Sequence, residues 1–136
     1  MNVYVDSSVL LRVVFGEPDA LTEWSRITSP TCSEVIRIES LRTIDRARIQ
    51  RRLDDAEVAR LRADLMRSIE AFTLIGLNDA VKARAGEPFP TTVGTLDAIH
   101  LSSALLAREQ VEDLRLATHD QELEIAARSL GFDVLT

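Results

Sequence analysis

A carboxylate and two hydroxyls directly follow a short apolar run at the start of the chain. Residues 2–5 are mostly β-branched or aromatic, which predicts a strand, and Asp6, Ser7 and Ser8 come next. Ligands of open α/β sheets bind just beyond the carboxyl ends of the strands, so Asp6 would be placed for chemistry. The alternative is that one of these three residues only caps a helix that starts near Val9, because each side chain accepts hydrogen bonds from free helix amides.

Three further acids can reach the same edge of the predicted sheet. Asp120 follows the fourth predicted strand, Asp97 lies in the first turn of a helix among apolar neighbours, and Glu39 lies inside an earlier helix. Each also has a structural alternative, as a charge near a helix N-terminus or on a solvated helix face. Glu34 competes with Glu39, but five helical residues place the two well apart around the helix, so only one of them should face the sheet edge.

The helix caps expected near Asp120 and Asp97 help to decide whether these acids are only charges near a helix N-terminus. Thr118 and Gln121 form a capping-box pattern, which puts Asp120 in the first turn of its helix, where the helix dipole favours negative charge. Thr95 is a candidate cap for the helix of Asp97, whose apolar neighbours make an unpaired carboxylate costly to bury. Asp97 therefore has the weaker structural explanation.

Four carboxylates gathered at one edge would need cations. Ionised carboxylates in one pocket repel and raise each other's pKa values unless positive charge intervenes. Hard divalent ions with oxygen ligands, Mg²⁺ or Mn²⁺, are the natural counterions. Cys32, His100 and His119 are the whole inventory of cysteine and histidine, so no cluster predicts zinc.

The composition fits a single domain spanning residues 1–136. The 136 residues are 46% hydrophobic, and no linker or internal repeat interrupts them. The net charge of −6 argues against a protein that holds nucleic acid by bulk positive potential. The single Cys32 can form no internal disulfide, and no stretch has the pattern of a signal peptide or a membrane span, so the expected location is the cytoplasm.

Strands and helices are expected to alternate along the chain. Such alternation predicts a parallel sheet inside a three-layer α/β/α architecture, and the continuous apolar run at residues 71–77 indicates a sheet covered on both faces. The expected strands are residues 2–5, 30–32, 71–77, 114–118 and 132–135. The expected helices are residues 9–15, 18–27, 33–52, 54–69, 78–86, 96–108 and 121–130, with Ser33, Asp54 and Asn78 as caps.

Several segments, in their order along the chain, resemble the PIN domain and, within it, the VapC-type toxins of toxin–antitoxin pairs. They are residues 3–10 (VYVDSSVL), 35–42 (VIRIESLR), 95–105 (TLDAIHLSSAL) and 117–123 (ATHDQEL) with 126–135 (AARSLGFDVL). The resemblance implies a five-stranded parallel sheet in the order 3-2-1-4-5, which makes the first and fourth strands neighbours and brings Asp6 and Asp120 together. It also implies a ribonuclease that hydrolyses RNA phosphodiester bonds.

The same resemblance assigns roles to residues. The catalytic, metal-binding group would consist of the four acids Asp6, Glu39, Asp97 and Asp120, the last being the fourth ligand. A hydroxyl beside the first acid, on Ser7 or Ser8, or the hydroxyl of Thr118 would orient the site. A bound Mg²⁺ or Mn²⁺ would lower the pKa of the attacking water, so no serine or histidine nucleophile is needed.

Two kinds of supporting residue are candidates. His100 falls one helical turn after Asp97 and could support the site, or it is a packed residue with local hydrogen bonds. The one basic segment of this acidic chain carries Arg42 and Arg46 on the helix face of Glu39. These arginines are candidate RNA phosphate contacts, with a solvated helix face as the alternative.

The resemblance also implies partners. The chain would be a homodimer acting on tRNA or another structured RNA, and a cognate VapB-type antitoxin would inhibit it by placing a basic tail in the acidic pocket. The non-catalytic alternative is a protein-interaction domain whose acids are only helix caps and surface charges. A phosphoaspartate receiver is disfavoured because the only lysine, Lys82, is misplaced, and a dehalogenase-type phosphatase because position 8 is serine.

Overall fold

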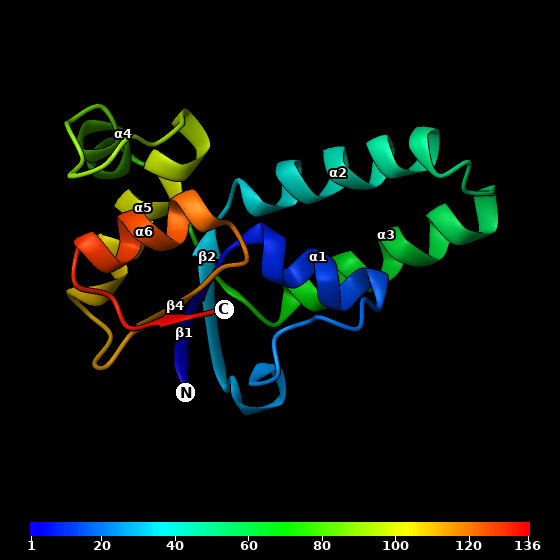
Figure 1. Cartoon of the computed structure of the whole chain (residues 1–136), viewed down its shortest axis with the longest axis horizontal. Coiled ribbons are helices and arrows are strands. Elements are labelled where there is room, and N and C mark those ends of the chain that lie inside the picture. Colours follow the sequence, from blue (N-terminus) through cyan, green and yellow to red (C-terminus); the bar gives the residue numbers. More distant parts are fainter.

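A parallel sheet of five strands runs through the centre of the chain in the order β3-β2-β1-β4-β5 (Figure 1). The structure is a computed structural model that describes residues 1–136. The strands are β1 (Asn2–Val5), β2 (Ser29–Ser33), β3 (Thr73–Ile75), β4 (Arg115–Ala117) and β5 (Val134–Leu135). The helices are α1 (Ser7–Phe15), α2 (Ile36–Gln50), α3 (Asp55–Glu70), α4 (Asp79–Ala85), α5 (Thr95–Arg108) and α6 (Gln121–Ser129), with a 3₁₀ turn, η1, at Trp24–Arg26. The predicted strand order is confirmed.

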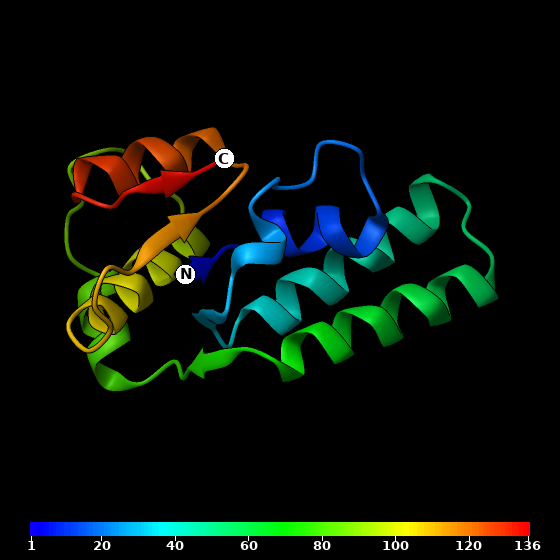
Figure 2. The same cartoon turned by 90° about the horizontal axis from the view of Figure 1, so that it is seen from below.

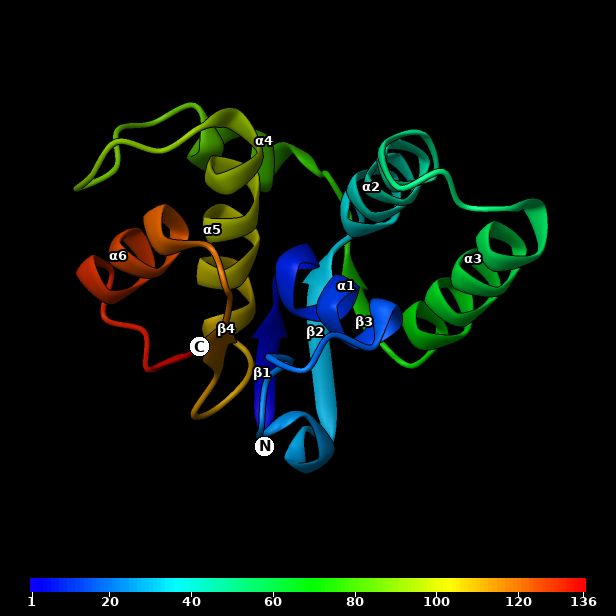
Figure 3. The same cartoon turned by 45° about the vertical axis from the view of Figure 1, so that its right-hand side comes forward.

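Helices cover both faces of this sheet, as the three-layer prediction requires. α1, α2 and α3 lie on one side of the strands, and α5 and α6 lie on the other, with α4 packed against α5 (Figure 2). The first turns of α1, α2 and α5 gather at the end of the sheet opposite the N-terminus (Figure 3). No helix combines the length and the apolar character that a membrane crossing requires.

The central strand β1 explains why two distant segments meet at that end. Residues 3–5 are fully buried, and β1 pairs in parallel with both β2 and β4. Val5 lies opposite Ala117, and the amide of Asp6 donates to the Ala117 carbonyl at 3.0 Å. Asp6 and Thr118, the residues that follow these two strands, therefore leave the sheet side by side.

Two predicted helix starts are wrong. α1 begins at Ser7, earlier than predicted, because Asp6 caps it. α2 begins at Ile36, since the predicted cap, Ser33, still belongs to β2 and pairs there with Ile75. Asp6 and Ser33 are both polar residues at the junction of a strand and a helix. Residue type does not show whether such a residue ends the strand or caps the helix.

The segment between α1 and β2 does not form the predicted helix of residues 18–27. Gly16 ends α1 as predicted, with a φ of 68° that favours glycine. Beyond it the chain makes separate turns and η1, and Leu21 is the only buried side chain of the segment. A short helix is stable when it packs an apolar face, which a single buried residue does not supply.

Other predicted caps are confirmed. Asp54 and Glu57 form a reciprocal capping box, with bonds of 2.8 and 3.0 Å to each other's amides, and the side chain of Asn78 caps α4. β3 is shorter than predicted and lies at the edge of the sheet, where Leu74 is 41% exposed. The prediction of coverage on both faces is therefore wrong at this edge.

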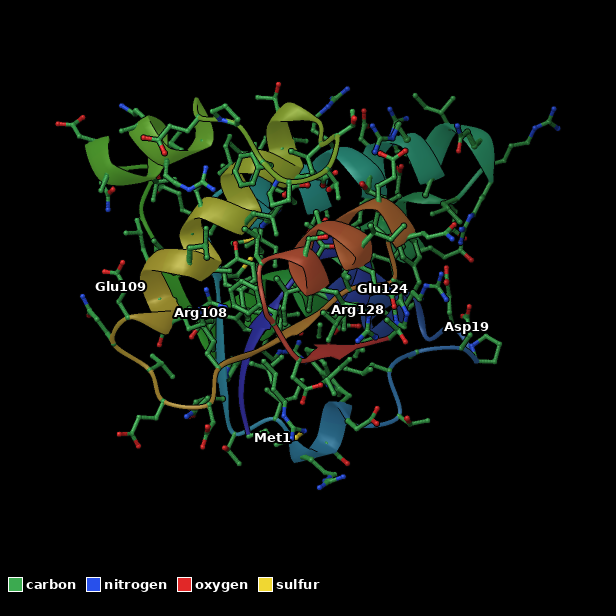
Figure 4. The ribbon with its side chains drawn as sticks, turned by 60° about the vertical axis from the view of Figure 1, so that its left-hand side comes forward. Met1, Asp19, Arg108, Glu109, Glu124 and Arg128 are labelled. Carbon is green, nitrogen blue, oxygen red and sulfur yellow. The ribbon has the colours of Figure 1, made fainter.

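Arg108, at the end of α5, joins the C-terminal elements to the rest of the chain (Figure 4). Its guanidinium lies 4.3 Å from the ring centre of Phe132 and donates to the Leu130 carbonyl at 3.0 Å. On α6 itself, Arg128 and Glu124 form an ion pair at 2.9 Å, and the two residues lie together in Figure 4. The contacts of Arg108 hold the segment between α6 and β5 against the end of α5.

Candidate active site

The two carboxylate oxygens of Asp6 have different surroundings. Oδ2 accepts hydrogen bonds from the Ser8 hydroxyl at 2.6 Å, the Thr118 hydroxyl at 3.0 Å and the Ser8 amide at 3.3 Å. Oδ1 lies 3.5 Å from the Ser7 hydroxyl and 3.7 Å from His100 Nε2. Asp6 is therefore a helix cap through Oδ2 and points Oδ1 toward other polar groups, so both interpretations of this residue are compatible with one conformation.

Ser8 and Thr118 connect the ends of β1 and β4. The Ser8 hydroxyl accepts a bond from the His119 amide at 2.9 Å while it donates to Asp6. The Thr118 hydroxyl accepts from the Asp120 amide at 2.9 Å and also donates to Asp6. Each hydroxyl thus uses both its donor and its acceptor, which fixes the direction of its hydrogen toward the carboxylate.

The cap of α6 is Asp120, and the predicted capping box of Thr118 with Gln121 is wrong. Asp120 Oδ1 accepts from the Glu122 amide at 2.8 Å and the Leu123 amide at 3.0 Å. The hydroxyl oxygen of Thr118 accepts from the Asp120 amide, which precedes the first residue of α6, so it does not cap the helix. Asp120 is exposed, and both capping bonds use one of its two oxygens.

Glu39 and His100 make a close contact beside Asp6. His100 Nε2 lies 2.5 Å from Glu39 Oε1, and the Ser7 hydroxyl lies 3.4 Å from Glu39 Oε2. Asp6, Glu39 and His100 each place one possible ligand atom within 4.8 Å of the others. Burial alone would lower the pKa of His100, but the hydrogen bond with Glu39 and the neighbouring carboxylates outweigh burial and raise it.

The side chain of Asp97 accepts no hydrogen bond from the protein, and several of its neighbours are also acidic. Partial burial, followed by the charges of Asp120 and Asp6, raises the pKa of Asp97 to about 6. Gly94, and not Thr95, stands at the N-cap of α5, so the predicted cap by Thr95 is wrong. Asp97 therefore lies within reach of the charges of Asp120, Asp6 and Glu39, and its half-buried carboxylate has no hydrogen-bond partner.

The choice between Glu39, on α2, and Glu34, in the turn before α2, is decided by their neighbours. Glu34 is exposed and its Oε1 accepts a bond from the Leu77 amide at 2.7 Å, which turns it toward the loop after β3. Glu39 points to His100 and Ser7 instead. The expectation that only one of the two would face the sheet edge is met, and that residue is Glu39.

A hollow of about 400 Å³ adjoins Glu39 on the α2 side. Its lining comes from the first residue of α1, the start of α5 and α2 with its N-cap residue, and consists of Ser7, Val35, Ile38, Glu39, Arg42, Thr43, Arg46 and Leu96. Arg42 pairs with Asp45 at 3.4 Å, and Arg46 donates to Thr43 at 3.1 Å. The structure thus places both predicted arginines in one hollow with Glu39.

Tyr4 belongs to the same network, and sequence reasoning missed it. Its hydroxyl lies 2.8 Å from His100 Nδ1 and accepts a bond from the Ser33 amide at 3.0 Å. A tyrosine in a fully buried central strand needs a partner for its hydroxyl, and this need was the available signal. The partner could not be named from the sequence, because it lies 96 residues away.

These features define a class of protein. It is a three-layer α/β protein with the strand order 3-2-1-4-5 and a group of acidic side chains at the carboxyl end of its central strands. The family model of the PIN domain matches residues 3–129. The chain belongs to the PIN domain family, as the resemblance of its sequence motifs implied.

Individual proteins agree with this assignment. Ribonuclease VapC46 of Mycobacterium tuberculosis (strain ATCC 25618 / H37Rv) is 33% identical over 136 residues, which cover 98% of this chain and 95% of that protein. A chain in the crystal structure of VapBC2 from Rickettsia felis, bound to a DNA fragment from its promoter, matches with a TM-score of 0.69. That match covers 100% of both chains at 11% identity, and it shows the fold alone.

Proposed function

We propose that this chain is a metal-dependent endoribonuclease and the toxin of a toxin–antitoxin pair, inhibited by a cognate VapB-type antitoxin. The observation that carries the proposal is that Asp6 and Glu39 each place an oxygen within 4.8 Å of the other, while the charges of both help to raise the pKa of Asp97. Similarity over nearly the full chain to a protein named ribonuclease VapC46 supports the substrate class. The fold shared with a VapBC2 chain supports the antitoxin partner.

The residues at this site fit a hard divalent cation. The donor set consists of carboxylate oxygens, which Mg²⁺ and Mn²⁺ prefer, and burial and the neighbouring carboxylates raise the pKa of Asp97 although His100 opposes them. The metal would be held by Asp6, Glu39 and Asp97, with Asp120 as the fourth acid. When bound, it would supply a lower pKa for the attacking water and stabilisation of the charge that develops on the phosphate.

The chain's own residues would prepare this site. Ser8 and Thr118 hold Oδ2 of Asp6, which leaves Oδ1 for the cation. The Ser7 hydroxyl lies between Asp6 Oδ1 and Glu39 Oε2, at 3.5 and 3.4 Å, and would keep these oxygens apart at a fixed spacing. Positioning of this kind is a large part of catalysis where the cation performs the electrostatic work.

RNA would approach along the hollow beside Glu39. Arg42 and Arg46 line it, and guanidinium groups bind phosphate oxygens in pairs. Local contacts of this kind are required because the net charge of the chain is −6. Within the proposal, the substrate is tRNA or another structured RNA, the active form is a homodimer and the place of action is the cytoplasm.

The proposal can be tested in cells by sequencing RNA ends. The chain would be induced in a bacterial host alone, with its Asp97→Asn variant as a matched control, and with the small protein encoded beside it. We expect new RNA ends and growth arrest with the parent chain, neither with the variant, and suppression of both by the neighbouring protein. Identical RNA ends for parent and variant would reject the nuclease assignment.

A further inference from the structure

We propose that Tyr4 and His100 are positioning residues that lock Glu39 in place, and that His100 is not a metal ligand although its Nε2 lies among carboxylate oxygens. One part of the inference, the effect on cation binding, rests on the proposed function. Its structural part, the hydrogen on Nε2, concerns the metal-free protein and stands independently of the reaction.

A backbone amide determines which groups donate and which accept in this hydrogen-bond network. The Ser33 amide can only donate, so the Tyr4 oxygen is the acceptor of that 3.0 Å bond. The hydroxyl hydrogen of Tyr4 remains available for His100 Nδ1, 2.8 Å away. Tyr4 and His100 are 0% and 1% exposed, so water does not compete for either group.

The contact with Glu39 requires a hydrogen on Nε2 of His100. A bare nitrogen lone pair and a carboxylate oxygen at 2.5 Å would repel each other, because both are acceptors. With the hydrogen on Nε2, the neutral ring accepts from Tyr4 at Nδ1 and donates to Glu39. The charged ring also carries a hydrogen on Nε2, so in either state this nitrogen has no lone pair to offer a cation.

Glu39 is the acid that most needs such support. It stands on α2, away from the strand ends that fix Asp6, and its long side chain has several rotatable bonds. Apart from His100, the protein offers its carboxylate only the 3.4 Å contact with the Ser7 hydroxyl. The chain of bonds from the Ser33 amide through Tyr4 and His100 therefore ties Glu39 Oε1 to the core, leaving Oε2 toward Asp6.

Nuclear magnetic resonance of the histidine nitrogens tests the structural part directly. The chain has two histidines, so the His119→Gln variant, labelled with ¹⁵N-histidine, reports on His100 alone. We expect Nε2 to carry a hydrogen in the metal-free protein and to keep it when Mg²⁺ is added. Loss of that hydrogen in either condition would overturn the inference.

Mg²⁺ affinity of matched variants, measured by calorimetry, tests the positioning role. His100→Gln keeps an N–H donor near the position of Nε2 and should bind Mg²⁺ about as tightly as the parent, whereas His100→Leu should bind roughly 10–100-fold more weakly. Tyr4→Phe removes the donor to Nδ1 and should weaken Mg²⁺ binding less than His100→Leu does. Equal losses for Gln and Leu would overturn the inference in favour of an imidazole ligand.

RNA cleavage separates this role from catalysis and from failure of the proposed function. Excess Mg²⁺ should restore the cleavage rate of His100→Leu, since a positioning residue acts on the metal affinity, and a deficit that excess Mg²⁺ leaves unchanged would overturn the inference. If the parent chain binds Mg²⁺ but cleaves no RNA, the proposed function fails while the tautomer and affinity results still decide the role of His100. Should His100→Leu not fold, the Mg²⁺ affinity of Tyr4→Phe decides it, because an unchanged affinity there would contradict the locking role.

Discussion

The acids at the end of the sheet fall into two halves that the protein treats differently. Asp6 and Glu39 are held by hydrogen bonds, with Ser8 and Thr118 on the first and His100 on the second. Asp97 has no such partner, and partial burial together with the carboxylates around it raises its pKa to about 6. One half is organised by the fold, and the other carries negative charge that the fold leaves uncompensated.

This difference indicates how such a site can be both stable and reactive. Fixed oxygens on Asp6 cost little to hold because their bonds also cap α1 and join β1 to β4. The unpaired carboxyl of Asp97 is a source of instability in the free protein, and a bound cation would remove it. Functional sites commonly contain a locally unfavourable interaction within a fold that is otherwise stable.

The largest expected effect is the loss of RNA cleavage when either half is neutralised. Asp6→Asn and Asp97→Asn should each lower the cleavage rate about a thousandfold or more, as expected for groups that stabilise charge in the transition state. Asn also caps helices well, so α1 should remain folded in the first variant. Glu34→Gln is the matched control and should cleave like the parent, since Glu34 only contacts the Leu77 amide.

A second prediction concerns the hydrogen-bonded half. Thr118→Val should lower the free energy of unfolding by about 1–3 kcal/mol, because Asp6 and the Asp120 amide both lose a buried partner. Thr118→Ser keeps the hydroxyl and should lose less. Urea unfolding of both variants measures the difference, and a larger loss for Thr118→Ser than for Thr118→Val would show that the methyl group, not the hydroxyl, is what matters.

In the absence of metal, Asp97→Asn should raise the free energy of unfolding, whereas Thr118→Val lowers it. Because the pKa of Asp97 is raised in the folded state, from 3.8 to about 6, folding favours its protonated form, and the parent loses stability as the pH rises across that range. With solvent screening of this half-buried group, the loss amounts to about 1–2 kcal/mol. The variant should thus be the more stable protein at pH 8 in chelator, with little difference at pH 4; a variant less stable than the parent at pH 8 would contradict this.

The smallest expected effect lies in the hollow beside Glu39. Replacing Arg42 and Arg46 by Ala should weaken RNA binding several-fold and flatten its dependence on salt by about 1.4 log units per log unit, as expected for two phosphate contacts to a single strand. The pair Arg62→Ala and Arg67→Ala on α3 removes equal charge outside the hollow and serves as the control. If both pairs change the salt dependence equally, Arg42 and Arg46 act only through net charge.

The sequence predicted what depends on residue type and strand order. Asp6 and Asp120 could be brought together because each follows a strand, and the parallel order makes those strands neighbours. Glu39 could not be separated from Glu34 by residue type, because the choice depends on how α2 is rotated against the sheet. The family resemblance assigned the site role to Glu39. The structure is consistent with that choice, because the Leu77 amide binds the side chain of Glu34.

What the sequence could not show depends on single bonds between distant residues. The hydroxyl of Thr118 was available to cap α6 or to bind Asp6, and only the register of β1 against β4 decides between them. Tyr4 was indistinguishable from any other buried aromatic residue until His100 lay beside it. The failed helix at residues 18–27 reflects the same limit, because local pattern does not reveal which side chains find a surface to pack against.

The most direct measurement is a crystal structure of the chain grown with Mn²⁺, with the ion located by its anomalous scattering. The account predicts an ion bonded to carboxylate oxygens of Asp6, Glu39 and Asp97, with His100 still bonded to Glu39 and not to the metal. An absence of ordered Mn²⁺ among these acids at saturating concentration would contradict the account.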